Sequence, residues 1–173
     1  MNIEEGFQIE FPKIFVGWGI SESELRELLE PHGLRHITTG YYVLSCKSLD
    51  GLIHELGFHF LPRSNGVLTE LEFFRSSYEN QKASFDDFQE HFERAFGKPT
   101  KSTMGNEGFP KHTWDLNGVN IVHFVFDRFG PEEHMRIRNY RTIQDRSKQN
   151  SASGFLLRMR GWIRMRSWIS FSG

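Results

Sequence analysis

Residues 84–97, with the sequence SFDDFQEHFERAFG, decide the fold because they predict a helix that needs a surface to pack on. Four phenylalanines recur at steps of three and four positions, which places them on one stripe of a helix. Ser84 is a candidate N-cap, and Gly97 followed by Pro99 predicts the end of the helix. The nearest structure available to cover this stripe is the set of strand-like runs that follows it. The four phenylalanines are Phe85, Phe88, Phe92 and Phe96.

Three strand-like runs come after this helix, at residues 112–116, 119–128 and 133–139. The run 119–128 is apolar on both of its sides, which predicts a central strand covered on both faces. In the last run, His134, Arg136 and Arg138 alternate with Met135 and Ile137. Strand alternation therefore predicts that these three basic residues point away from the core.

The first half of the chain resembles the second half in its order of elements. Ser21 and Glu24 form a capping-box pattern that opens a short helix over 21–29, and strand-like runs follow at 40–47, 55–61 and 67–75. Residues 7–16 predict a strand interrupted at Pro12, which indicates an edge strand or a bend. We expect an α+β fold: a single, mainly antiparallel sheet with two helices packed on one face, built as a tandem helix-plus-three-strand repeat. The alternative is an α+β chain with regular turns and no duplication.

The chain has 173 residues, which suits one domain. We assign residues 1–139 to the α+β domain and residues 140–173 to a polar linker followed by a basic segment rich in Arg and Trp. The six-residue repeat within 157–169 preserves strand alternation, so a strand-like segment is favoured there, with a disordered tail as the alternative.

Charge is unevenly distributed along the chain. Residues 136–173 carry eight arginines, one lysine and a single acid, so the net charge of −1 leaves −9 on residues 1–135. Such an acidic body attracts basic protein surfaces and argues against nucleic-acid binding. The chain has no basic leader and no apolar run of about 20 residues, which predicts a cytoplasmic protein without membrane contact. The single cysteine, Cys46, cannot form an intrachain disulfide, and we interpret it as a packed thiol.

Strand alternation places four candidate partner-binding residues, Glu55, His59, Glu70 and Glu72, on the solvent side of the sheet. An open sheet face with three carboxylates is a natural docking patch for a basic surface. The same His59, Glu70 and Glu72 group could instead perform acid–base chemistry.

Four further residues, His112, His123, Asp127 and His134, lie close together in the sequence and are candidate metal ligands. Their spacing fits no helical metal motif, and one cysteine excludes a thiolate-rich zinc cluster. We therefore interpret the histidines as packed or surface residues and expect no metal, no cofactor and no catalytic residue.

Residues 88–100 (FQEHFERAFGKPT), Trp114 and residues 123–137 (HFVFDRFGPEEHMRI) resemble small bacterial immunity proteins that neutralise polymorphic toxins. The resemblance implies a compact, acidic, cytoplasmic α+β protein that binds a cognate toxin domain without catalysis. It carries over no individual site residue, because that family diversifies its surfaces.

The expected function is therefore a non-catalytic protein-binding module, an immunity-type inhibitor of a toxin domain with a basic surface. One alternative is a small hydrolase-like enzyme that uses His123, Asp127 or the His59, Glu70 and Glu72 group. Another is nucleic-acid binding through the basic C-terminal segment, whose Arg and Trp residues could contact phosphates and bases. The same segment also predicts a homodimer, because exposed alternating strands pair with other chains.

Overall fold

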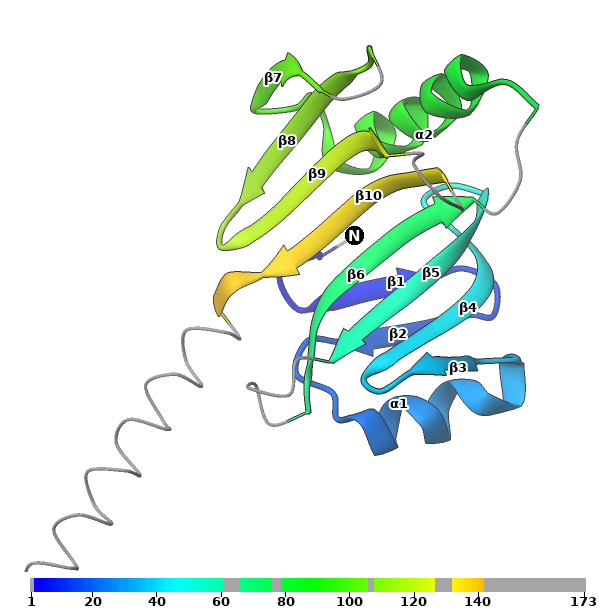
Figure 1. Cartoon of the computed structure of the whole chain (residues 1–173). Helices are drawn as coiled ribbons and strands as arrows, with labels where there is room; N and C mark the ends of the chain where they lie inside the picture. The colour runs from blue at the N-terminus through cyan, green and yellow to red at the C-terminus, as the bar shows by residue number, and fades with distance from the viewer. Residues whose placement is uncertain (1, 61–65, 76–78, 106–107, 127–131, 142–173) are drawn as a thin grey trace, which may run out of the picture.

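The computed structural model describes residues 2–60, 66–75, 79–105, 108–126 and 132–141. Its centre is an eight-stranded antiparallel sheet with the spatial order β3-β4-β5-β6-β10-β9-β8-β7 (Figure 1). The expected α+β class with a mainly antiparallel sheet is confirmed. The strands are β3 (Arg35–Thr38), β4 (Tyr41–Ser48), β5 (Leu52–Phe60), β6 (Leu68–Arg75), β7 (Lys101–Met104), β8 (Pro110–Leu116), β9 (Val119–Phe126) and β10 (Glu132–Asn139).

The two halves of the chain have the same arrangement, a helix followed by a four-stranded meander. Helix α1 (Glu22–Leu29) precedes β3 to β6, and helix α2 (Gln81–Phe96) precedes β7 to β10. The last strands of the two halves, β6 and β10, pair with each other at the centre of the sheet. The prediction of three strands per half is wrong, because each half has an additional short strand, β3 or β7. Both are four residues long and exposed throughout, so they carry no hydrophobic alternation to signal a strand.

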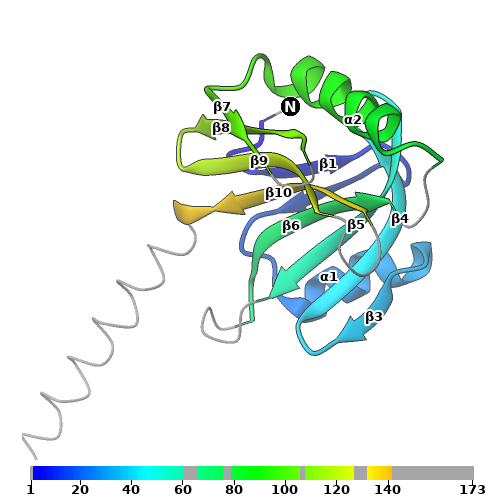
Figure 2. The ribbon, with the colours of Figure 1, turned by 45° about the horizontal axis from the view of Figure 1, so that its top comes forward.

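One face of the sheet is covered by the two helices and by a small hairpin that lies between them (Figure 2). The hairpin consists of β1 (Gly6–Ile9) and β2 (Ile14–Gly17). The interruption predicted at Pro12 is therefore present, but it separates two paired strands, and the expectation of a single strand is wrong. Its Phe7 is fully buried and meets Phe73 of β6 edge-on, with ring centroids 5.2 Å apart. We call this side the covered face. In the part of the chain that the structure describes, no helix or strand lies over the opposite side, which we call the open face.

Helix α1 begins as predicted. The Ser21 side chain accepts from the backbone N–H of Glu24, and the Glu24 carboxylate accepts from the backbone N–H of Ser21 at 2.8 Å. Leu25 and Leu29 are fully buried. The Tyr42 hydroxyl donates to Glu22 and so ties the helix to β4.

Helix α2 begins four residues earlier than the sequence indicates. Its N-cap is Asn80, whose side chain accepts from the Ala83 N–H at 2.9 Å, so Ser84 lies inside the helix and faces the sheet. Gly97 is the C-cap, as predicted, and has a positive φ of 78°, which glycine adopts readily. The phenylalanine stripe packs on the sheet: Phe85, Phe88 and Phe92 are buried, and Phe96 is half-buried. Neither of the described helices is long and apolar enough to cross a bilayer.

Candidate functional site

The centre of the open face carries a network of opposite charges between β6 and β10. The strand register places Glu70 opposite Arg138 and Glu72 opposite Arg136, so each cross-strand pair joins an acid to an arginine. Arg138 donates to Glu70, and Arg136 lies 3.2 Å from Glu70 and 3.7 Å from Glu72. We call the four residues Glu70, Glu72, Arg136 and Arg138 the charged lattice, and we include in it His59 and Tyr41, which extend it. The sheet topology brings the acids and the arginines together, because α2 and β7 to β9 separate β6 from β10 in sequence while the two strands are neighbours in the sheet.

Glu72 is the most constrained carboxylate of the lattice. It lies 2.9 Å from His59 Nε2 and accepts from the Tyr41 hydroxyl, also at 2.9 Å. Burial pushes the pKa of Glu72 upward, but the hydrogen bonds from His59 and Tyr41 outweigh it and lower the pKa below its usual value. Tyr41 reaches Glu72 across Gly57, where a Cβ atom would lie only 2.9 Å from the tyrosine ring. Gly57 therefore makes room for this contact.

All four predicted partner-binding residues lie on the open face, but their carboxylates are less exposed than the cations that pair with them. The exposed fractions are 16% and 14% for the side chains of Glu70 and Glu72, against 40% and 34% for Arg138 and Arg136. The Glu55 carboxylate is likewise covered by a cation, because one of its oxygens lies 2.6 Å from a guanidinium nitrogen of Arg35. A molecule that approaches this face meets the cations before the acids. The role of these residues in binding stays a prediction.

Eight of the 21 acidic residues in 1–135 lie in two helical segments on the other side of the molecule. Residues 22–32 hold four glutamates and one arginine, and α2 holds four acids against one lysine and one arginine. These helices lie on the covered face (Figure 2). Part of the negative charge that the sequence assigns to the body therefore lies on the covered face.

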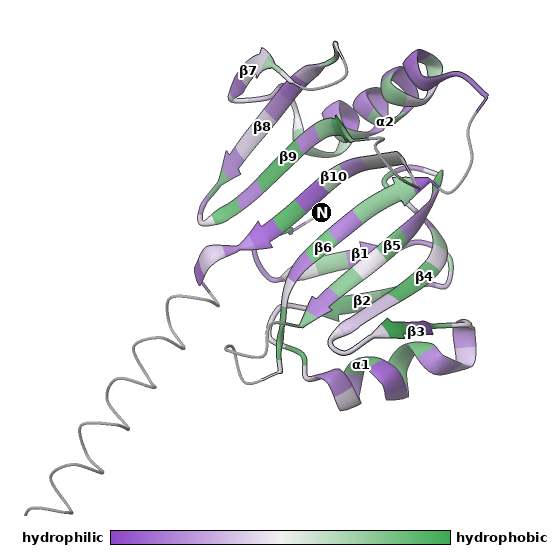
Figure 3. Ribbon diagram, viewed as in Figure 1, coloured by the Kyte–Doolittle hydropathy of each residue, from purple (hydrophilic) through white to green (hydrophobic). Residues whose placement is uncertain are grey.

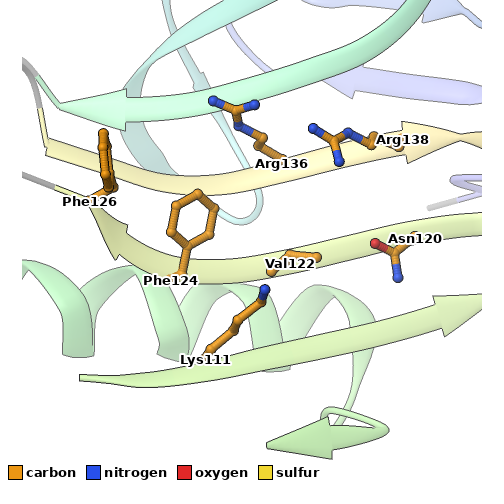
Figure 4. A pocket seen from close by; sticks show the side chains of 7 residues that line it. All are labelled: Lys111, Asn120, Val122, Phe124, Phe126, Arg136 and Arg138. Carbon is orange, nitrogen blue, oxygen red and sulfur yellow. The ribbon is translucent and has the colours of Figure 1, made fainter. Parts of the chain in front are cut away.

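Next to the lattice, the open face has a hollow of about 310 Å³. Val122, Phe124 and Phe126 of β9 form its apolar part, and Phe126 is 40% exposed. The prediction that β9 is covered on both faces is therefore wrong. The apolar second side of this strand faces the hollow, and Figure 4 shows the side chains that line it. We call it the β8–β10 hollow, and its residues are Lys111, Asn120, Val122, Phe124, Phe126, Arg136 and Arg138.

Two histidines that the sequence offers as candidate metal ligands or catalytic bases are buried on the covered face. His123 and His134 are both fully buried. The expectation that His134 points outward with Arg136 and Arg138 is wrong. The register of β10 shifts between Glu133 and Met135, and the bulge turns His134 onto the covered face.

A chain of hydrogen bonds joins these histidines to α2. His123 Nδ1 lies 2.6 Å from the Gln89 side-chain oxygen, and His123 Nε2 lies 3.1 Å from His134 Nδ1. His134 Nε2 lies 3.1 Å from the Ser84 hydroxyl, which also accepts from Arg75 at 3.3 Å. One proton arrangement satisfies every bond, with both histidines neutral and protonated on Nδ1.

The surroundings of His123 favour this neutral form. Burial, followed by the charges of His134 and His112, holds the pKa of His123 well below its usual value. Phe85 stacks on His123 at 4.3 Å, and Phe88 stacks on His134 at 3.9 Å. With both rings enclosed by α2, neither histidine can reach a substrate while the helix stays in place.

A third buried histidine, His54, lies further along the covered face. Its Nε2 is 2.6 Å from the Ser48 hydroxyl and 3.8 Å from Cys46 Sγ. Burial lowers the pKa of His54 to about 4, despite a hydrogen bond to the Glu55 carbonyl, and burial raises the pKa of Cys46 to about 12. Cys46 is thus a packed thiol with little thiolate character at neutral pH, as expected.

Two other expectations fall on parts of the chain that are not described. Asp127, a candidate for both metal binding and catalysis, lies outside the described residues. So do residues 142–173, nearly all of the predicted linker and basic segment (140–173), with its expected strand, dimer contact and nucleic-acid contact. Within the described ranges, no group of three or more His, Cys, Asp or Glu side chains is placed to hold a metal ion.

Comparisons with protein-family models, with curated proteins and with solved structures find no match for this chain.

Proposed function

We propose that this chain is a non-catalytic protein-binding module, an immunity-type inhibitor that binds and neutralises a cognate toxin domain through the open face of its sheet. One observation carries the proposal: an eight-stranded sheet has a full layer on one face, while its other face combines a charged lattice with partly exposed Phe126. Figure 3 shows that hydrophilic and hydrophobic residues alternate along the central strands β6 and β10. Solvated sheet faces are normally polar, so exposed apolar side chains beside the lattice favour a docking role.

The alternative of a small enzyme has less support from the same geometry. His123 is sealed under α2 by Phe85 and hydrogen-bonded to Gln89, so it is a structural residue. His59 is half-buried on the open face, where Glu72 holds it in the lattice. A general base needs a proton within hydrogen-bond reach on a bound substrate, and no described residue forms a nucleophile–base pair with His59.

The proposal predicts that a toxin gene lies beside the gene of this chain in the source genome, and it is tested by producing the two proteins together. We expect the two proteins to co-purify as a complex and the toxin's activity to fall in proportion to the amount of this chain. Full protection should require at least one chain per toxin molecule, because a binder acts by occupancy. Protection by a small fraction of that amount would indicate catalysis, and an uninhibited toxin without a complex would reject the proposal.

A further inference from the structure

We propose that the β8–β10 hollow is a docking site for a partner segment that presents a carboxylate beside an apolar side chain. This inference rests on the proposed function for the existence of a protein partner, and it adds the chemistry of the contact. It also reverses the charge expected from sequence, since the cations and not the acids of the open face would meet the partner.

The apolar half of the site comes from one side of a single strand. Val122, Phe124 and Phe126 occupy alternate positions of β9, so they project together on the open face (Figure 4). The hollow of about 310 Å³ is at the lower end of the roughly 300–1,000 Å³ typical of small-ligand sites. This size suits the insertion of an apolar side chain from a partner. Burying an exposed aromatic ring such as Phe126 would also supply much of the binding energy.

The polar half of the site comes from Lys111 on one side and from Arg136 and Arg138 on the other. Lys111 is exposed, and no ion pair to its ammonium group is seen among the described residues. Each guanidinium has five N–H donors in a planar fork, so an arginine can bind a second carboxylate while it keeps Glu70. The hollow thus has cations on both sides of an apolar floor, an arrangement complementary to an acidic amphipathic segment.

A nucleic acid is a poorer fit than a protein for the same cations. Two of the three, Arg136 and Arg138, already neutralise Glu70, and Glu72 lies beside them. Nucleic-acid binding gains its affinity from many phosphate contacts, whereas residues 1–141 carry a net charge of −6 even with the arginines of the hollow included. A single carboxylate needs only a few donors, which the hollow offers.

The test is a selection of random peptides displayed on phage against the full chain, run in parallel against the double variant Lys111→Glu/Phe126→Ser. Neither side chain belongs to the charged lattice, so the lattice stays intact in this variant. The matched control is Lys47→Glu, which makes the same charge change at an exposed position of β4, at the other end of the open face. Synthetic copies of the enriched peptides are then titrated against all three proteins.

We expect the wild-type chain to enrich peptides with Asp or Glu next to a large apolar residue. Their affinity should fall by about tenfold or more in the double variant, equivalent to about 1.4 kcal/mol, and should be unchanged in Lys47→Glu. Enrichment of basic peptides, no enrichment, or equal binding to the double variant would overturn the inference. So would tighter binding of a single-stranded oligonucleotide that depends on Lys111, since the hollow would then be a nucleic-acid site.

This outcome is separable from that of the proposed function. If the double variant still binds and neutralises the toxin as well as the wild-type chain does, the inference about the hollow fails while the inhibitor proposal stands. If no toxin is bound but acidic peptides still select the hollow, the proposed function fails and the docking chemistry stands.

Discussion

The two faces of the same sheet handle polar groups in opposite ways. On the covered face, His54 and His123 are enclosed, hydrogen-bonded and held neutral by burial. On the open face, Glu70, Glu72, Arg136 and Arg138 form ion pairs with one another across the β6–β10 pair. The polar groups of the covered face therefore stabilise the fold, because these histidines already have hydrogen-bond partners inside the protein. The open face keeps exposed cations and the partly exposed ring of Phe126, which none of the described residues covers.

The largest expected effect tests the covered face. Phe88 is fully buried, stacks on His134 and lies 4.7 Å from the guanidinium carbon of Arg75. Replacing it by alanine would leave a cavity under α2 and should lower the free energy of unfolding by about 3–5 kcal/mol. Urea denaturation of wild type and Phe88→Ala would measure the loss. A loss below about 1 kcal/mol would mean that α2 does not pack as described.

The next effect is a pH dependence that comes from the buried histidines. The pKa of His54 is about 4 in the folded chain and about 6.5 when unfolded, so only the unfolded state binds the proton between these values. Stability is therefore complete above pH 6.5 and falls as the pH drops toward 4, by about 3 kcal/mol for His54 alone. The lowered pKa of His123 acts in the same direction.

Urea denaturation at a series of pH values between about 7 and 5 would measure this slope, in a range where most carboxylates remain ionised. In the variant His54→Gln, the free energy of unfolding should change less steeply with pH. The slope should be smaller by the contribution of one proton, about 1.4 kcal/mol per pH unit. A free energy of unfolding that does not change with pH would contradict the neutral, buried histidines.

A smaller effect tests the geometry of the charged lattice. In Gly57→Ala, the new methyl group would lie 2.9 Å from the Tyr41 ring and 3.2 Å from a Glu72 oxygen. We expect a loss of about 1–3 kcal/mol as Tyr41 is displaced from Glu72. The double variant Gly57→Ala/Tyr41→Ser should recover part of this loss, because the crowded ring is gone. If Gly57→Ala were as stable as wild type, Tyr41 would not cross β5 at this point.

The smallest effect is expected for substitutions in the β8–β10 hollow. Lys111→Glu should change the free energy of unfolding by within about 0.5 kcal/mol because Lys111 is exposed, and Phe126→Ser should cost about 1 kcal/mol because its ring is only 40% exposed. Comparing the loss of stability in Phe126→Ser with that in Phe88→Ala compares two aromatic residues on opposite faces of the sheet. Destabilisation of Phe126→Ser by several kcal/mol would place Phe126 in the core and remove it from any docking surface.

Much of the fold could be predicted from the sequence, because its signals are local. The stripe of Phe85, Phe88 and Phe92 and the capping box at Ser21 depend on spacings within one element, and both are confirmed. Strand alternation likewise placed Glu70 and Glu72 on the outer side of the sheet, which the structure confirms. The short edge strands β3 and β7 gave no such signal, since a strand exposed on both faces needs no apolar alternation.

The candidate site was harder to predict because its charges come from strands that are distant in the sequence. Nothing local indicates that Arg136 and Arg138 would lie beside Glu70 and Glu72, and that pairing changes which charges are exposed. The β-bulge that turns His134 inward also has no local signature. The apolar residues of β9 are evident in the sequence, but a strand that is apolar on both sides can be covered by the protein itself or by a partner. Sequence alternation does not distinguish these two cases.

Site-specific photo-crosslinking in cells of the source organism tests the central claim most directly. A benzophenone amino acid would be placed at position 126 on the open face and, in a second variant, at exposed position 90 on α2. We predict a discrete protein adduct from position 126 that disappears when Lys111→Glu is added, and no adduct from position 90. An adduct from position 90 with none from position 126 would contradict the assignment of the open face as the docking surface.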